Sequence, residues 1–309
     1  MRGAFKTAWS MTRQTFSEWS DDKGGRLGAA LSYYTIFSLA PLLLLVISIA
    51  GLAFGRQAAE GRIFEQLAGI LGADAAELVQ GAVAKASSTK GGVIGTIVGM
   101  AVLLLGATGI VIELQGALNA VWKVKPKPNR GVWGVVRTRI LSVAMILSLG
   151  FLLLVSLVVS AALAALSGWL RRVIGDVAML GWLLDAVVAV SVIATMIALI
   201  YKFLPDARVA WRDVWVGAAA TAVLFLIGKY LIGLYIGKAS VGTAFGAAGS
   251  LAVLLVWIYY SAQIVLLGAE FTRVYANRFG EKVKPSAQAV PAGADVDRPP
   301  APDALPQKA

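Results

Sequence analysis

Three ionisable residues stand inside stretches of this sequence that are otherwise apolar. Glu113 and Glu270 each follow a run of small and aliphatic residues, and Lys229 lies within a third such run. A charged side chain at the depth of a bilayer is energetically expensive, so it indicates a functional site by default, such as an ion pathway or a substrate pocket. These residues are therefore the first candidates for chemistry.

Glu113 shares one face of a predicted helix with four glycines. At 100° per residue, the five positions fall within about 60° of one another. Glycines on one face let a second helix approach closely, which predicts that Glu113 faces protein and not lipid. The alternative is that Glu113 lies at the cytoplasmic end of the helix and meets water. The glycines of this packing face are Gly92, Gly95, Gly99 and Gly106.

A second polar face lies in the last apolar stretch. It begins with two packing glycines and continues through Tyr260, Gln263 and Glu270, all within about 120°. These polar groups either form a hydrogen-bonded seam between helices or line a polar pathway or pocket. Glu270 is also close to Arg273, where the sequence predicts a surface ion pair that contributes little to stability. The two packing glycines are Gly246 and Gly249.

The first apolar stretch, "LSYYTIFSLAPLLLL" at 31–45, contains many hydroxyl groups and one proline. The proline removes a backbone donor and predicts a bend that frees the carbonyl of Phe37. Together with the polar residues of the other two faces, this stretch predicts a hydrated cavity that opens toward the cytoplasm. A kink with a purely structural role is the alternative. The candidate pathway residues here are Tyr33, Tyr34, Ser38 and Pro41.

Lys229 is placed by the same spacing in the outer half of its predicted helix. Its aliphatic stem could carry the ammonium outward to the lipid headgroups. If the side chain points inward, it is the natural cation for an anionic substrate. Both alternatives remain open from the sequence.

The composition indicates a membrane protein. Of 309 residues, 58% are hydrophobic and 15% are charged, and the mean hydropathy is +0.76, which a single soluble core could hardly hold. Six stretches supply the roughly 20 apolar residues that a helix needs to cross a hydrocarbon core. The sequence therefore predicts an all-α polytopic membrane protein with six transmembrane helices. Their predicted bounds are 29–53, 92–116, 140–166, 180–203, 214–236 and 247–271.

The distribution of basic residues predicts the orientation. Counting Lys202 at the end of the fourth span, 20 of the 28 Lys and Arg residues lie at the two ends and in the second and fourth loops. Positive residues are retained on the cytoplasmic side, so both ends are predicted to be cytoplasmic in a bacterial inner (plasma) membrane. The net charge of +11 follows from this bias and calls for no nucleic acid; anionic lipid headgroups are the expected partners. The chain has no cysteine and no histidine, and we expect no metal and no cofactor.

Three segments flank or interrupt the predicted membrane domain, 29–276. Residues 1–28 predict a cytoplasmic amphipathic helix that lies in the interface or packs on the spans. Residues 54–91 predict a two-helix hairpin on the outer face. Residues 277–309 hold six of the ten prolines and predict a disordered cytoplasmic tail. The aromatic stripe of the amphipathic helix comprises Phe5, Trp9, Phe16 and Trp19.

Two segments of the sequence carry a family resemblance. They are "GGRLGAALSYYTIFSLAPLLL" at 24–44 and "FGAAGSLAVLLVWIYYSAQIVLLGAEFTRVYA" at 245–276. The sequence closely resembles the YihY/BrkB family of bacterial inner-membrane proteins, formerly mislabelled ribonuclease BN, over about residues 5–280. The resemblance implies six helices with cytoplasmic ends, and a link to virulence, serum resistance or the export of lipid and other envelope components. It supplies no catalytic residues.

Three function classes compete. Metal-dependent phosphodiester cleavage needs clustered carboxylates or histidines, and the acids of this chain are scattered, so we expect no enzyme. The kinked first span, the glycine faces and the intramembrane polar groups favour a transporter or exporter-like protein for an envelope-related or lipid-like substrate. A non-transporting scaffold for envelope assembly or resistance is the alternative, with an envelope protein or a second copy of the chain as its partner.

Overall fold

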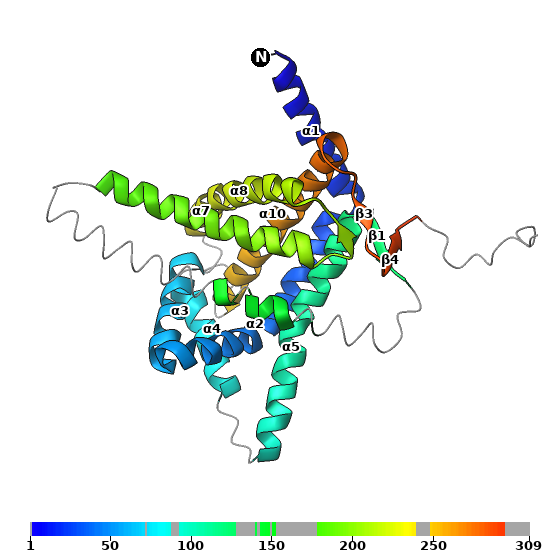
Figure 1. Ribbon diagram of the computed structural model, residues 1–309. Coiled ribbons are helices and arrows are strands. Elements are labelled where there is room, and N and C mark those ends of the chain that lie inside the picture. The colour runs from blue at the N-terminus through cyan, green and yellow to red at the C-terminus, as the bar shows by residue number, and fades with distance from the viewer. Residues whose placement is uncertain are drawn as a thin grey trace, which may run out of the picture.

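The computed structural model describes residues 2–71, 73–87, 93–127, 140, 143–148, 150–152, 178–238 and 248–293. Helices dominate these ranges (Figure 1). The main helices are α1 (Arg2–Asp21), α2 (Gly24–Phe54), α3 (Arg56–Leu71), α4 (Ala73–Ser87), α5 (Val93–Val121), α7 (Ala178–Phe203), α8 (Trp211–Lys238) and α10 (Gly249–Phe279).

The helical membrane class predicted from the sequence is confirmed. Among the described residues, four helical segments are long and apolar enough to cross a bilayer: Gly24–Ser48, Ala186–Phe203, Trp211–Ile232 and Gly249–Phe279. They overlap the first, fourth, fifth and sixth predicted spans. Helix α5 covers the second, with 29 residues. The third predicted span, 140–166, lies largely outside the described residues.

Helix α10 is at the centre of the packing. It lies against α1, α2 and α8, while α5 packs on α2 and α7 packs on α8 (Figure 1). One apolar core joins the ends of α5, α7, α8 and α10, with Leu118, Tyr201 and Leu266 fully buried. Burial of such side chains stabilises each by about 2 kcal/mol. A smaller core joins α2, α3, α4 and the start of α10.

The predicted hairpin between the first two spans is present as α3 and α4. Phe64 and Val79 are buried against α2 in the smaller core, and Ile63 and Leu67 pack on its edge. The apolar side of the hairpin is therefore part of the fold and is not open to a partner. Leu78 of α4, 40% exposed, points away from this core.

The predicted amphipathic helix is α1, and it packs against α10. Met11 and Thr15 are buried, whereas Trp9 and Phe16 are 67% and 54% exposed. One face of the helix thus packs on the bundle, while Trp9 and Phe16 of the aromatic stripe are exposed and Trp19 is half-buried. Rings at that position suit the headgroup region of a bilayer.

The predicted disorder of the tail is wrong for residues 277–293, of which 277–279 belong to α10. Strand β4 (Ala289–Pro291) pairs antiparallel with β1 (Val124–Pro126), and β3 (Lys284–Pro285) pairs with β2 (Ala207–Arg208). The prolines lie at strand ends, where the missing donor does little harm. The composition of the tail wrongly predicted disorder, because these residues are held by backbone hydrogen bonds to β1 and β2 and bury little apolar surface. Residues 294–309 lie outside the described residues.

Removing the tail strands is expected to destabilise the protein. The amides of Ser286 and Ala292 donate to the carbonyls of Asp206 and Lys123, and each such bond contributes about 1 kcal/mol net. A chain that ends at Gly280 should unfold at a lower temperature, by several degrees, than a chain that ends at Gly293, which keeps both strands. Thermal unfolding in detergent measures the difference, and equal midpoints would show that the pairing contributes nothing.

Candidate functional site

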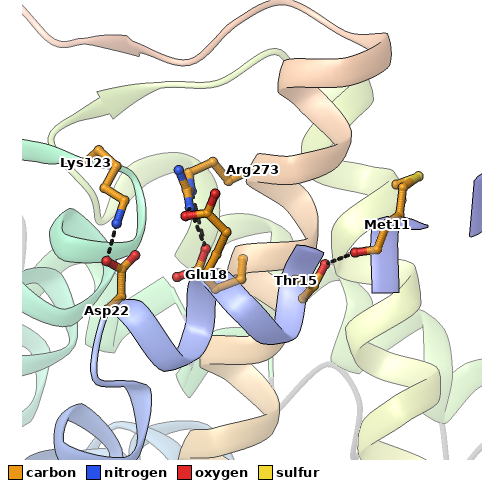
Figure 2. A network of polar contacts seen from close by, with 7 residues as sticks. Met11, Thr15, Glu18, Asp22, Lys123 and Arg273 are labelled. Carbon is orange, nitrogen blue, oxygen red and sulfur yellow. Dashed lines mark hydrogen bonds and ion pairs between the residues drawn. The ribbon is translucent and has the colours of Figure 1, made fainter. Parts of the chain in front are cut away.

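Three acidic and two basic side chains meet where the end of α1 lies beside α10 (Figure 2). Arg273 donates to Oε2 of Glu18 at 2.6 Å and to Oε2 of Glu270 at 3.0 Å. Lys123, which follows α5, forms an ion pair with Oδ1 of Asp22. We call these five residues the charged cluster.

The centre of the charged cluster is buried. Glu270 is 0% exposed and Arg273 is 8% exposed, because α1 covers this part of α10. The surface ion pair predicted from the sequence is therefore wrong. A buried pair differs from a surface pair because removing one partner leaves an uncompensated charge in a low-dielectric interior.

Two lysines at this cluster have a left-handed backbone conformation. Lys23 has φ 56° in the turn between α1 and α2, and Lys123 has φ 55° after α5. This conformation costs a non-glycine residue about 1 kcal/mol, and glycine is the usual choice. At position 123 a glycine would suit the backbone but would leave Asp22 without its cation.

The turn between α1 and α2 is fastened to α10 by Gln263. Its Oε1 accepts a hydrogen bond from the indole of Trp19 at 2.9 Å, and its amide nitrogen donates to the carbonyl of Gly24 at 3.3 Å. The same nitrogen occupies the space that a Cβ at Gly28 would fill, at 1.9 Å. Of the two alternatives for Gln263, this geometry is that of the seam between helices.

A second seam joins α7, α8 and α10. The hydroxyl of Tyr201 donates to the carbonyl of Val265 at 2.6 Å and lies 3.3 Å from the hydroxyl of Thr221. Both groups pack over the backbone of Gly268, where a Cβ would lie 1.9 Å from Thr221 Oγ1. All polar atoms of this seam are used within the protein, so it has a packing role.

Lys229 lines a cavity of about 380 Å³ between α2, α3, α7, α8 and α10. All of its other lining residues are apolar. Lys229 is thus the one charged residue in an otherwise apolar lining, and its side chain is exposed. The residues around it include Leu39, Ile193, Phe225, Leu254 and Trp257.

A larger groove of about 610 Å³ lies between α1, α8 and α10 on the other side of α8. Phe16, Leu224 and Phe271 are among its residues, and its lining is almost wholly apolar. It faces outward, as a surface that meets hydrocarbon would. No group of three or more acidic, histidine or cysteine residues within the described ranges could hold a metal ion.

Comparison with known proteins bears on the same residues. The sequence profile of the family described as virulence factor BrkB matches residues 15–292. The chain belongs to the BrkB family. The match includes the C-terminal part of α1, all five residues of the charged cluster and Lys229.

Several relatives of the chain are described as UPF0761 membrane proteins. A UPF0761 membrane protein of Verminephrobacter eiseniae is 29% identical over 85% of this chain and 62% of its own length. Proteins of the same description from Albidiferax ferrireducens and Pseudomonas aeruginosa (strain LESB58) are 30% and 31% identical, over 84% and 87% of this chain and 61% and 63% of their own lengths. The chain spans about three fifths of the length of these relatives. No solved structure matches it.

The hydroxyl-rich stretch of this BrkB-family chain lies in α2, which continues through Pro41. Tyr33 and Tyr34 are 60% and 43% exposed and point to the outside of the bundle. Ser38 is buried and donates to the carbonyl of Gly106 in α5 at 2.6 Å. Pro41 lies over the same glycine, so these two residues serve the α2–α5 contact.

The remaining predicted residues are not brought together in one cavity. Glu113 is half-buried in α5 and forms no ion pair with a described residue. Tyr260 packs over the backbone of Gly228 in α8. Neither cavity given above is lined by Glu113, Gln263 or Glu270.

The packing role of the predicted glycines is confirmed at Gly106, where a Cβ would lie 3.1 Å from Pro41 Cγ. Gly249 is buried at the start of α10. Gly92 and Gly246 lie outside the described residues. Gly95 and Gly99 lie in α5, and the structure describes no packing for them.

The sequence reasoning missed Glu18, Asp22 and Lys123. One signal was present, because Glu18 and Asp22 are four residues apart and so share a helical face. Amphipathic helices often carry such acids in water, however, and nothing local showed that this face is covered.

Proposed function

We propose that this BrkB-family chain is a transporter of the bacterial inner membrane, with both ends in the cytoplasm, that carries an amphipathic anion. The observation that supports it most is that the exposed Lys229 is the one charged residue lining an otherwise apolar cavity. An ammonium attracts a phosphate or carboxylate strongly where water is scarce. Apolar walls accept a hydrocarbon chain. A lipid-like anion combines the two, and we expect the chain to carry it without catalysing a reaction.

The depth of Lys229 favours a lipid with its headgroup away from the cytoplasmic side. Trp211 and Trp215, at the start of α8, are both 44% exposed, as residues of an aromatic belt are. Lys229 follows Trp211 by 18 positions, which at 1.5 Å per residue is roughly 27 Å along the helix. Trp211 and Trp215 therefore lie near one membrane–water interface, and Lys229 lies near the opposite one.

A scaffold role is the second candidate. It is favoured by Leu78, which α4 exposes beside its buried face. Leu78→Asp tests this candidate without touching either core, because a scaffold contact at α4 would be lost while lipid binding at Lys229 would persist.

Lys229→Met is expected to reduce binding of an anionic lipid by about tenfold, because the single cation of the cavity is removed while its apolar stem is kept. The measurement is retention of phosphatidylglycerol and of phosphatidylcholine by the purified chain, followed by phosphatidylglycerol flipping in proteoliposomes. Lys229→Arg should keep most of the binding.

Arg62→Met is the matched control, since Arg62 is an exposed cation of α3 outside the cavity. It removes the same charge and should leave retention unchanged. The proposal fails if Lys229→Met retains phosphatidylglycerol as the unaltered chain does, or if both substitutions reduce it equally.

A further inference from the structure

Two buried carboxylate oxygens in the charged cluster have no hydrogen-bond partner among the described residues: Oδ2 of Asp22 and Oε1 of Glu270. The other oxygen of each carboxylate is occupied. Oδ1 of Asp22 pairs with Lys123, and Oε2 of Glu270 accepts from Nε and a terminal nitrogen of Arg273 at 3.3 and 3.0 Å. A buried acceptor left unpaired is destabilising by about 1–3 kcal/mol, so two in one place require an explanation.

The carboxyl group of Asp22 is a neighbour of the carboxyl group of Glu270. Two ionised carboxylates cannot form a hydrogen bond with each other, because neither carries a donor. Their charges also repel each other. One proton removes both difficulties, since a protonated carboxyl donates to its ionised neighbour.

The charge balance of the cluster supports the same conclusion. Glu18, Asp22 and Glu270 face two cations, Lys123 and Arg273, so full ionisation leaves one negative charge in excess. Burial makes an excess charge expensive. The facing charged groups come from α1, from the turn between α1 and α2, from the turn after α5 and from α10. The described parts of α2, α7 and α8 add no charged group to the hydrogen bonds and ion pairs of the cluster.

We propose that Asp22 and Glu270 together bind one proton, held between Oδ2 of Asp22 and Oε1 of Glu270. The proton comes from water, the O–H of one carboxyl donates to the other, and no further reactant takes part. Because Asp22 belongs to the turn between α1 and α2, the bound proton fastens that turn to α10. Its loss leaves two facing carboxylates and loosens the junction.

This site is separate from the Lys229 cavity and does not depend on the transport proposal. A metal ion is a poorer occupant, since the described residues contain no group suited to hold one.

Unfolding should release the proton into neutral solution, because exposed carboxyls are ionised there. The stability of the folded chain should therefore decrease as the pH rises, the sign expected when the native state holds more protons than the unfolded state.

Infrared spectroscopy of the full chain in lipid nanodiscs tests the proposal directly. At neutral pH the unaltered chain should show the carbonyl stretch of one protonated carboxyl, shifted in heavy water and lost as the pH is raised. Asp22→Asn and Glu270→Gln, which keep the shape of the site, should each abolish that band. They should also flatten the dependence of the unfolding temperature on pH between about pH 6 and pH 9.

Asp213→Asn is the control, because Asp213 is equally buried but accepts its hydrogen bond from the backbone amide of Glu281. It should keep the band. Glu18→Gln should shift loss of the band to lower pH, since it removes the excess negative charge. The absence of a protonated carboxyl in the unaltered chain at neutral pH overturns the proposal, as does stabilisation by Na⁺ with no dependence on pH. The infrared spectrum of the unaltered chain tests the proposal by itself, even if a variant fails to fold.

Discussion

Replacing Arg273 with methionine is expected to lower the free energy of unfolding by about 3–5 kcal/mol, the range for a buried ion pair that loses one partner. Arg273 is the cation that both Glu18 and Glu270 share, and Glu270 has no access to solvent. Without it, the cluster keeps three acids and one cation, or takes up a further proton. The measurement is thermal or denaturant unfolding in detergent, together with the yield of monodisperse protein.

Arg278→Met is the matched control on the same helix. Arg278 is exposed and donates to the hydroxyl of Ser10, so its loss should be close to neutral. Combining Arg273→Met with Glu270→Leu should recover much of the lost stability, because both charges leave the interior together. If Arg273→Met is no more harmful than Arg278→Met, the cluster is solvated and the burial argued above is wrong.

The apolar helices could be predicted because the signal is local. A window of about 20 residues decides whether a helix suits a bilayer, and no distant contact enters that decision. The same holds for α3 and α4, whose helical period is visible within each segment. Helix bounds were less accurate at the ends of α2 and α10, where polar residues continue the helix beyond the apolar stretch.

The charged cluster could not be predicted because its pairs join distant parts of the chain. Asp22 and Lys123 are 101 positions apart, and Glu18 and Arg273 are 255 positions apart. A helical wheel shows which residues share a face, but it does not show which helix covers that face. The supposed surface pair at Glu270 is buried for this reason, since α1 packs on it.

The hydroxyl-rich stretch shows a second limit. Ser32 and Thr35 donate to backbone carbonyls four residues earlier in α2, at 2.8 and 2.6 Å. Ser48 does the same. A hydroxyl satisfied within its own helix needs neither water nor a partner helix. Counting hydroxyl groups in an apolar segment therefore overstates the evidence for a hydrated cavity.

Gly268→Ala should destabilise the protein by about 3 kcal/mol, at the upper end of the cost of overpacking a core. An added Cβ would lie 1.9 Å from Thr221 Oγ1 and 2.7 Å from the hydroxyl of Tyr201. Neither side chain can withdraw freely. Thr221 donates to the carbonyl of Gly217, and Tyr201 donates to that of Val265. The change should therefore force α8 away from α10 and lower the unfolding temperature.

Gly116→Ala provides the comparison, because Gly116 is also helical but a Cβ there meets nothing within 4 Å. That substitution should be neutral or stabilising by up to about 1 kcal/mol, since alanine is the better helix former. Gly28→Ala should fall between the two, because the atom in its way is the end of the flexible Gln263 side chain. The order Gly268, Gly28, Gly116 follows from close approach and not from helix propensity, which would make all three alike. Equal effects at Gly268 and Gly116 would mean that α8 and α10 are not in contact in the membrane.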